Sequence, residues 1–119
     1  MPLIFVYGTL KRRGANHAHL AGQRFVAEAR TEPTYRLYRL PGYPGMVETR
    51  PPGRSIEGEI WEIDAGCLAR LDVLENITAG EYLRAPVRLL PPHDVLRAET
   101  YLYLRSVADK PDAGTGLEG

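Results

Sequence analysis

The alternation of hydrophobic and polar residues along the chain predicts a protein made mostly of β-strands. Residues 3–6 are apolar throughout, which is typical of a strand buried on both faces. Further strands are predicted where apolar residues recur at every second position or β-forming residues cluster, over 23–29, 34–40, 56–63, 82–90 and 96–104. Gly58 lies within one of these segments, and a glycine inside a strand indicates a bulge or the close approach of another group.

Two segments have a helical pattern instead. Apolar residues recur at three- and four-residue spacing over residues 65–75, and the preceding Asp64 is a favourable N-cap. Cys67 belongs to the apolar face of this helix and is predicted to be buried. A shorter helical turn that ends at Leu20 is predicted after Asn16, whose side chain would cap it.

The order of these elements predicts a single α+β domain over residues 1–107. Because strands dominate and neighbours can pair antiparallel, a small closed or nearly closed sheet would hide the strand edges. Residues 41–53 hold seven of the chain's 12 glycines and 10 prolines, and we predict a structured but irregular loop there. Residues 108–119 have little to bury, so we expect a mobile tail.

Composition narrows the functional classes. The 119 residues carry 15 basic and 15 acidic side chains, and this balance argues against nucleic acid or an anionic membrane surface as a partner. No apolar run approaches the ~20 residues that span a bilayer, and the short apolar start does not have the pattern of a signal peptide. With one cysteine and three histidines, the chain offers no disulfide and no zinc-ligand spacing. We therefore expect a cytoplasmic enzyme or binding domain that holds no metal. These observations do not predict its oligomeric state.

The loop Tyr7-Gly8-Thr9-Leu10 directly follows the first buried strand. A glycine at a strand end lets successive backbone N–H groups converge on an anion such as a carboxylate. An ordinary tight turn is the alternative interpretation, since glycine is common in turns of every kind.

Three further side chains are candidates for chemistry. Glu75 lies at the end of the predicted helix among apolar residues, which would raise its pKa into the range useful for proton transfer. The alternative is a helix-end glutamate that points to water. Tyr82 and Arg84 lie two apart in a strand and so share a face, where they could bind a small anion. Alternatively, Tyr82 is a core residue and Arg84 is exposed.

Taken together, these segments resemble the γ-glutamylcyclotransferase-like (AIG2-like) family, and most closely its γ-glutamylamine cyclotransferase branch. The motifs are FVYGTLKR at 5–12 with Asn16-His17 after it, EGEIWEI at 57–63, and LDVLE at 71–75 followed by EYLR at 81–84 and Val87. The resemblance extends from about residue 3 to residue 104. It implies a small mixed, largely antiparallel β-barrel flanked by short helices.

The resemblance also implies a reaction on a small-molecule substrate. The free α-amine of a γ-glutamyl group attacks its own γ-carbonyl, which releases 5-oxoproline and an amine, and no cofactor is required. Glu75 matches the family's catalytic glutamate and would act first as base and then as acid. The amides of Gly8, Thr9 and Leu10 would hold the substrate α-carboxylate, with Tyr7 and Tyr82 as further substrate-binding contacts in the pocket.

The resemblance leaves the released amine open. Arg84 is expected to support the site from outside, and the loop containing Tyr43 and Met46 is expected to set which amine fits. Leu74 stands where many relatives have an aromatic residue, so specificity can differ. Two other functions stay open: removal of a γ-glutamyl protecting group from a biosynthetic intermediate, and non-catalytic binding of a small acidic metabolite.

Overall fold

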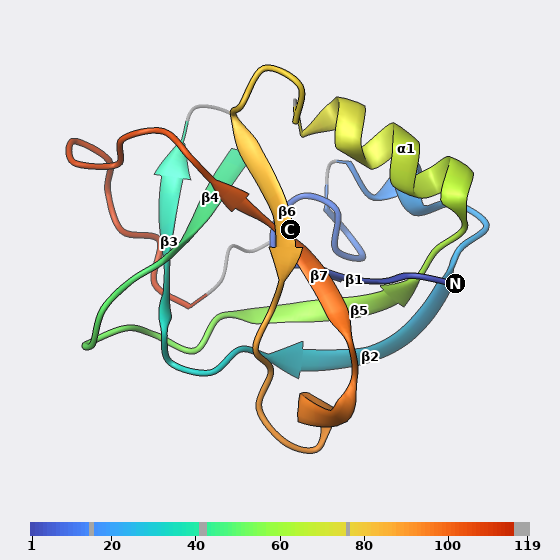
Figure 1. Cartoon of the computed structure of the whole chain (residues 1–119), viewed down its shortest axis with the longest axis horizontal. Helices are drawn as coiled ribbons and strands as arrows, with labels where there is room; N and C mark the ends of the chain where they lie inside the picture. The colour runs from blue at the N-terminus through green and yellow to red at the C-terminus, as the bar shows by residue number, and fades with distance from the viewer. Residues whose placement is uncertain (15, 41–42, 76, 116–119) are drawn as a thin grey trace.

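The first strand occupies the centre of the sheet in the computed structural model, which describes residues 1–14, 16–40, 43–75 and 77–115 (Figure 1). The five-stranded sheet has the order β2-β5-β1-β7-β6, and within it only the β1–β7 pair is parallel among the described strands. Its strands are β1 (Leu3–Val6), β2 (Arg24–Arg30), β5 (Glu57–Glu62), β6 (Tyr82–Pro86) and β7 (Ala98–Tyr103). The mixed α+β class predicted from the sequence is confirmed.

The remaining elements surround this sheet. A separate antiparallel hairpin is formed by β3 (Tyr35–Leu40) and β4 (Tyr43–Glu48). The described chain also contains one α-helix and two short 3-10 helices: α1 (Ala65–Leu74), η1 (His17–Leu20) and η2 (His93–Val95). In the part of the chain that is described, no helix is long and apolar enough to cross a membrane.

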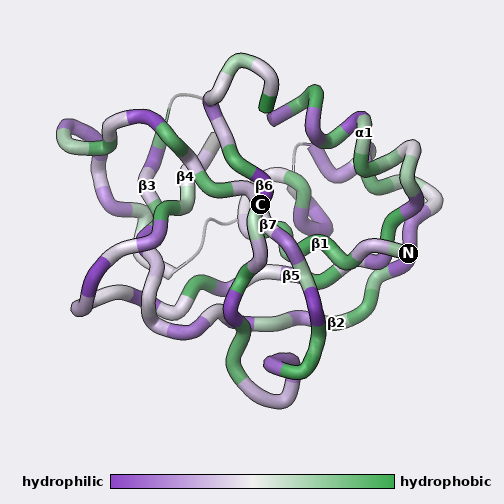
Figure 2. The backbone as a smooth tube through the Cα atoms, in the orientation of Figure 1, coloured by the Kyte–Doolittle hydropathy of each residue, from purple (hydrophilic) through white to green (hydrophobic). Residues whose placement is uncertain are grey.

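The prediction that β1 is buried on both faces is confirmed. Phe5 packs in one hydrophobic cluster and Ile4 in the other, and both side chains are completely buried. Successive side chains of a strand point to opposite faces, so this one strand joins the two cores. Figure 2 shows the hydrophobic colour along β1 in the middle of the molecule.

Gly58 confirms the predicted close approach. A Cβ atom at this position would lie 2.4 Å from the carbonyl oxygen of Val6 and 2.5 Å from Cζ of Phe5. The irregularity in the β2–β5 pairing lies elsewhere, between Phe25 and Ala27. The glycine is therefore required because β1 and β5 leave no space for a side chain.

The irregular loop predicted over 41–53 is wrong for residues 43–48, which form β4 and pair with β3. A Cβ atom on Gly45 would lie 2.8 Å from Cδ1 of Leu40 and 3.0 Å from Cβ of Tyr103. The glycine thus lets a strand pack tightly here, although the composition suggested a loop. Residues 41–42 lie outside the described residues.

The closed barrel expected from the resemblance is not formed by the described strands. The hairpin β3–β4 packs against β7, but it stays a separate two-stranded sheet beside the five-stranded one. Figure 1 shows the hairpin at the left and α1 at the upper right, on either side of β6. The two sheets pack against each other, but the hydrogen bonds between described strands do not continue around a closed barrel.

Part of the predicted mobile tail is attached to the hairpin. The backbone N–H of Arg39 donates to the carbonyl oxygen of Pro111, and that of Ala113 donates to Leu37, each at 2.8 Å. Asp112 also forms an ion pair with Arg36 at 2.9 Å. Residues 111–113 thus follow β3 because backbone groups, which the composition does not reveal, hold them there, and the carbonyl oxygen of Thr115 accepts from the backbone N–H of Glu57 on β5. Residues 116–119 lie outside the described residues.

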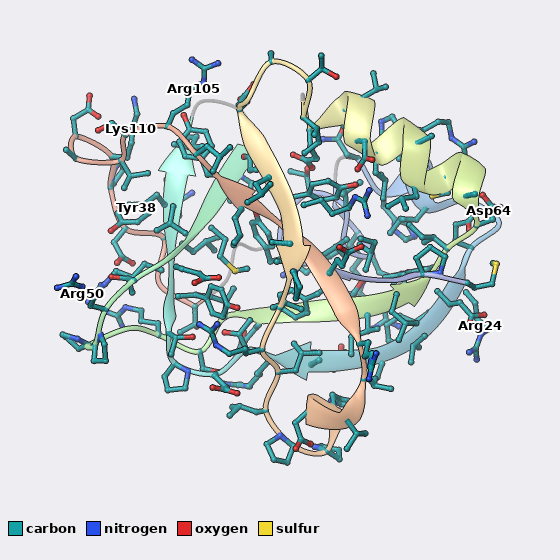
Figure 3. The ribbon with its side chains drawn as sticks, in the orientation of Figure 1. Arg24, Tyr38, Arg50, Asp64, Arg105 and Lys110 are labelled. Carbon is teal, nitrogen blue, oxygen red and sulfur yellow. The ribbon has the colours of Figure 1, made fainter. Side chains whose placement is uncertain are left out.

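Helix α1 begins as predicted. The Asp64 carboxylate accepts a hydrogen bond from the backbone N–H of Cys67 at 2.7 Å, and Figure 3 shows Asp64 at this end of the helix. Cys67 and Leu71 are completely buried, as the pattern predicts. At the other end, Val73 and Leu74 are exposed.

The close approach at Gly58 can be tested by substitution. We expect Gly58→Ala to lower the free energy of unfolding by about 2–4 kcal/mol, because the added methyl group must displace backbone. Gly66→Ala in α1 is the control: its Cβ meets only ordinary contacts, the nearest at 3.4 Å. Alanine should stabilise the helix there by about 0.5–1 kcal/mol. Urea unfolding followed by circular dichroism measures both, and equal changes would contradict the packing at Gly58.

Candidate active site

Residues from distant parts of the chain meet around a small inner cavity of about 40 Å³. Its lining consists of Phe5, Val6, Tyr7, Gly8, Thr9, Leu10, Pro44, Glu75, Tyr82 and Tyr101. The structure therefore brings together the loop at 7–10, the end of α1 and the start of β6. These are the segments in which the sequence analysis placed the catalytic glutamate and its anion-binding loop.

A second, outer cavity of about 220 Å³ shares three lining residues with the first: Thr9, Glu75 and Tyr82. The rest of its described lining is Asn16, Val73, Leu74 and Glu81. Glu75 borders both spaces, so its carboxyl group can act on a molecule that extends from one into the other.

Glu75 occupies the C-terminal end of α1, where its backbone N–H donates to the carbonyl oxygen of Leu71 at 2.9 Å. Burial of its carboxyl group, and secondly the negative charge of Glu81, raise its pKa to about 7. Both causes disfavour the charged form. A carboxyl group with this pKa can accept and release a proton at neutral pH.

The loop at 7–10 is held in place by the residues that follow it. The Asn16 side-chain amide donates to Oγ1 of Thr9, and the Asn16 backbone N–H donates to the Thr9 carbonyl oxygen, both at 2.9 Å. The predicted side-chain cap by Asn16 is not formed at η1, because that side chain binds Thr9 instead. Nδ1 of His17 lies 3.0 Å from the carbonyl oxygen of Leu10. The loop is therefore positioned before any ligand binds.

Glu59 is a buried residue that helps to hold the segment after this loop in place, and the sequence pattern did not single it out. Its carboxylate accepts hydrogen bonds from the backbone N–H and Nε of Arg12 and from Nε1 of Trp61. Burial opposes its ionisation, but these donors outweigh burial and hold the pKa of Glu59 below its usual value. The guanidinium of Arg12 also lies 3.9 Å from the ring centre of Phe25. Arg12 thus anchors the segment after the loop.

The two tyrosines predicted to contact substrate use their hydroxyl protons within the protein. Tyr7 donates to the carbonyl oxygen of Tyr101 at 2.6 Å and accepts from the backbone N–H of Met46 at 3.3 Å. Tyr82 donates to the carbonyl oxygen of Pro44 at 2.8 Å. Burial, and then the charge of Glu75, raise the pKa of Tyr7 far above its usual value, so it stays a neutral donor. These hydroxyl groups hold β4 against the cavity, and the rings form its wall.

Gly8 is required by the same packing. A Cβ atom on Gly8 would lie 2.4 Å from Cγ of Pro44 and 2.9 Å from its Cδ. Any side chain at this position would push β4 away from the loop. Together with the Tyr82–Pro44 hydrogen bond, this contact closes the cavity on the β4 side.

Asp72, Tyr101 and Arg84 form a network beside the cavity. Arg84 lies outside the described linings of both cavities and donates from Nε to Oδ1 of Asp72 at 3.0 Å and from Nη1 to Glu99 at 2.7 Å. The Tyr101 hydroxyl donates to Oδ1 of Asp72 at 2.7 Å. Asp72 precedes Glu75 by three residues, a spacing that places both on one side of a helix and could have revealed the connection. The network fixes the end of α1 against β6 and β7.

Of the two residues proposed to set specificity, Met46 lies away from both cavities. The Met46 side chain is completely buried in the hydrophobic core and lines neither cavity. Its backbone N–H donates to the Tyr7 hydroxyl, and its strand partner is Leu37. Tyr43 begins β4, and its side chain lies outside the described residues. The outer cavity is instead bordered by α1, through Val73 and Leu74.

A larger hollow of about 490 Å³ lies on another part of the surface and is bordered by residues of β2, β5 and the segment before η2. Charged side chains of its lining form ion pairs: Arg30 pairs with Glu57 at 2.6 Å, and the buried Glu59 pairs with Arg12. Within the described chain, no group of three or more His, Cys, Asp or Glu side chains could hold a metal ion.

Comparisons with known proteins identify relatives of this chain. Residues 4–116 match the family described as γ-glutamyl cyclotransferase, AIG2-like. A relative from Vibrio cholerae is 42% identical over 82 residues, which make up 69% of this chain and 68% of the relative. The γ-glutamylcyclotransferase family protein YtfP of Escherichia coli is 34% identical over 104 residues, 87% of this chain and 84% of its own.

Solved structures have the same architecture. The crystal structure of an AIG2-like protein from Mus musculus superimposes with a TM-score of 0.81 at 26% identity and covers 99% of this chain and 88% of its own. The solution structure of the E. coli YtfP protein gives a TM-score of 0.70 at 33% identity, covering 96% and 93%. The family match extends over residues 4–116 and the fold agrees with it, so the chain belongs to the AIG2-like γ-glutamyl cyclotransferase family.

Proposed function

We propose that the protein cyclises γ-glutamyl amides of the γ-glutamylamine type to 5-oxoproline and releases the amine. The observation that supports this most is the position of Glu75, whose pKa is raised to about 7, opposite the loop of Gly8, Thr9 and Leu10 in one cavity. A proton-transfer group and a set of backbone donors then face the two ends of a glutamyl group.

In this proposal the inner cavity takes the α-carboxylate of the substrate. Its volume of about 40 Å³ suits a small polar group, since a water molecule in the liquid has a share of about 30 Å³. The amides of the loop act as donors, so no positively charged side chain is needed there. The γ-amide then lies beside Glu75, and the leaving amine extends into the outer cavity.

The chemistry needs only proton transfer. Ionised Glu75 takes a proton from the α-ammonium group, and the freed amine attacks the γ-carbonyl carbon to form the new C–N bond of the ring. Glu75 then gives its proton to the departing nitrogen as the original C–N bond breaks. It also takes the second proton from the ring nitrogen and passes it to the released amine, so the amine leaves as its ammonium ion, the ring nitrogen of 5-oxoproline is neutral and the carboxylate is regenerated. Holding the amine and carbonyl in one bent conformation supplies much of the rate, because the attack is intramolecular. No cofactor takes part in this scheme.

Removal of a γ-glutamyl protecting group would use the same steps with a larger amine. A panel of γ-glutamyl amides, assayed by release of 5-oxoproline, distinguishes these substrates. A folded protein that binds a γ-glutamyl amide and cyclises none of the panel would instead support the binding module considered from the sequence.

Glu75→Gln removes the proton-transfer group while keeping its shape. We expect kcat for the best γ-glutamyl amide to fall by about 10²–10⁴-fold, the range typical of general acid–base catalysis. Binding of the unreacted substrate, measured by calorimetry on the variant, should persist because the loop amides are unchanged. Circular dichroism confirms that the variant is folded, and wild-type turnover would reject Glu75 as the base.

The activity should depend on pH through Glu75. Because the base must be ionised, kcat/KM should fall as the pH drops, with a midpoint near pH 7. An unperturbed glutamate would place this midpoint near its model value of 4.5. Initial rates of 5-oxoproline release across the pH range measure the midpoint, and a value near 4.5 would contradict the buried environment of the carboxyl group.

The same shift predicts a change in stability. The pKa of Glu75 is higher in the folded protein than its model value of 4.5, so the folded state holds the proton more strongly. Stability is then lost as the pH rises from about 4.5 to about 7. Glu75→Gln should therefore raise the free energy of unfolding at about pH 8.5 by up to ~3 kcal/mol, and should change it little at about pH 4. Urea unfolding at the two pH values measures this, and an equal effect at both would contradict it.

A further inference from the structure

Most of the hydroxyl groups at the site give their protons to the protein itself. The described linings of the two cavities contain the hydroxyl groups of Tyr7, Thr9, Tyr82 and Tyr101. Tyr7 and Tyr82 donate to backbone carbonyl oxygens of β7 and β4, at 2.6 and 2.8 Å. Tyr101 donates to a carboxylate oxygen of Asp72 at 2.7 Å. A phenol has a single proton, so these three groups have none left to donate to a substrate.

The Thr9 hydroxyl is bound in the opposite sense. Its oxygen accepts a hydrogen bond from the side-chain amide of Asn16 at 2.9 Å. A hydroxyl group has one proton and two lone pairs, and the proton cannot point toward the group that donates to its oxygen. Among the described residues, no acceptor is bound to this proton. Thr9 therefore keeps a hydrogen-bond donor for a ligand.

The position of Thr9 places this donor at the reacting bond. Thr9, Glu75 and Tyr82 are the residues that border both cavities in the described linings. Under the proposed function, on which this step rests, the reacting amide lies beside Glu75 where the two cavities meet. The Tyr82 proton is bound to Pro44, and Glu75 carries out the proton transfer. Thr9 is therefore the side chain at this junction whose proton can stabilise the amide oxygen.

The reaction needs a donor at that oxygen. When the α-amine attacks the γ-carbonyl carbon, the carbonyl oxygen gains negative charge, and donors that are already in place stabilise such an oxyanion. The proposed mechanism uses the loop amides for the α-carboxylate and Glu75 for the protons, so neither of them supplies this donor. A neutral hydroxyl group can supply it without giving up its own proton.

We propose that the Thr9 hydroxyl donates a hydrogen bond to the γ-carbonyl oxygen of the substrate and stabilises the oxyanion, and that Asn16 is the positioning residue that orients it. The proton stays on Thr9 throughout, and no bond to Thr9 forms or breaks. Asn16 fixes the direction of the donor before the substrate binds, because it occupies one lone pair of the hydroxyl oxygen. The backbone N–H of Asn16 also donates to the carbonyl oxygen of Thr9 at 2.9 Å, so the main chain of Thr9 is fixed as well.

Thr9→Val replaces the hydroxyl group by a methyl group of similar size. We expect kcat for the best γ-glutamyl amide to fall by about 10²-fold, near the lower end of the effect of removing one oxyanion donor. KM should change by less than about threefold, because the lost bond acts mainly in the transition state. Thr9→Ser keeps the hydroxyl group and should keep most of the wild-type kcat. Initial rates of 5-oxoproline release measure these values.

Thr49→Val is the matched control for this change. The Thr49 hydroxyl donates to the carbonyl oxygen of Arg50 at 3.2 Å, and Thr49 lines neither cavity at the site. Its kcat and KM should equal those of the wild type. Circular dichroism shows whether the Thr9 variants are folded, and calorimetry with 5-oxoproline shows whether they still bind the product. If Thr9→Val does not fold, Thr9→Ala takes its place, since it also removes the hydroxyl group.

Two variants of Asn16 test its orienting role, with kcat measured at about pH 9, well above the pKa of Glu75. Asn16→Ala removes the side-chain donor and should lower kcat less than Thr9→Val does, because the hydroxyl group remains. Asn16→Asp keeps the shape but can only accept, so it should draw the Thr9 proton away from the substrate and lower kcat further than Asn16→Ala. In the Thr9→Val background, Asn16→Ala should have no further effect, and any remaining effect of Asn16→Asp measures its added charge.

The outcomes separate this inference from the function on which it rests. A folded Thr9→Val protein with kcat within about threefold of the wild type, with only KM raised, or without 5-oxoproline binding would overturn the role of the hydroxyl group while cyclisation itself stands. Equal losses in Thr9→Ser and Thr9→Val would overturn it too. Additive effects of Asn16→Ala and Thr9→Val would overturn the positioning role of Asn16. Failure of the folded wild-type protein to cyclise any γ-glutamyl amide of the panel would overturn the proposed function.

Discussion

The contact between β4 and the loop at Gly8 is the constraint on which the site depends. Pro44 packs where a side chain of residue 8 would lie, and the hydroxyl of Tyr82 binds the Pro44 carbonyl oxygen. Tyr7 joins β4 to β7 by binding Met46 and the backbone of Tyr101. These contacts exclude water from one side of the cavity. Since burial is the main cause of the raised pKa of Glu75, the reactivity of that group depends on how closely β4 packs.

A second constraint acts on the helix. Glu75 follows the last turn of α1, which is an unfavourable position for a negative charge because the carbonyl ends of a helix are themselves negative. The end of α1 stays in place because Asp72 is bound by Arg84 and Tyr101, from two strands of the sheet. Asp72 thus has an ionic partner and a hydrogen-bonding partner. Glu75, one turn later, lies in an environment that favours its protonated form. Of the two carboxyl groups, Glu75 is therefore the one with a raised pKa, as the proposed proton transfer requires.

The sequence predicted those features that depend on neighbouring residues. The apolar run of β1, the cap at Asp64 and the raised pKa of Glu75 all follow from local pattern, and the structure agrees with each. The strand β4 was missed because its glycine and proline residues normally mark loops, and only packing against Tyr103 shows why Gly45 is needed. The same limit applies to the tyrosines: their positions at the cavity were predicted, whereas their hydroxyl partners depend on tertiary contacts.

The hydrogen bonds that hold the cavity together also determine which of its hydroxyl groups remains for the substrate. The three tyrosines of the lining give their protons to the protein, and each of these bonds fixes a strand or the end of α1. Thr9 accepts from Asn16 instead, on a loop whose backbone is already fixed, so the described part of the protein does not use its proton. A cavity that excludes water strengthens the hydrogen bond that this proton makes, and the same exclusion raises the pKa of Glu75. Under the proposed function, the close packing of β4 therefore supports both the proton transfer and the oxyanion, and looser packing would weaken the two together.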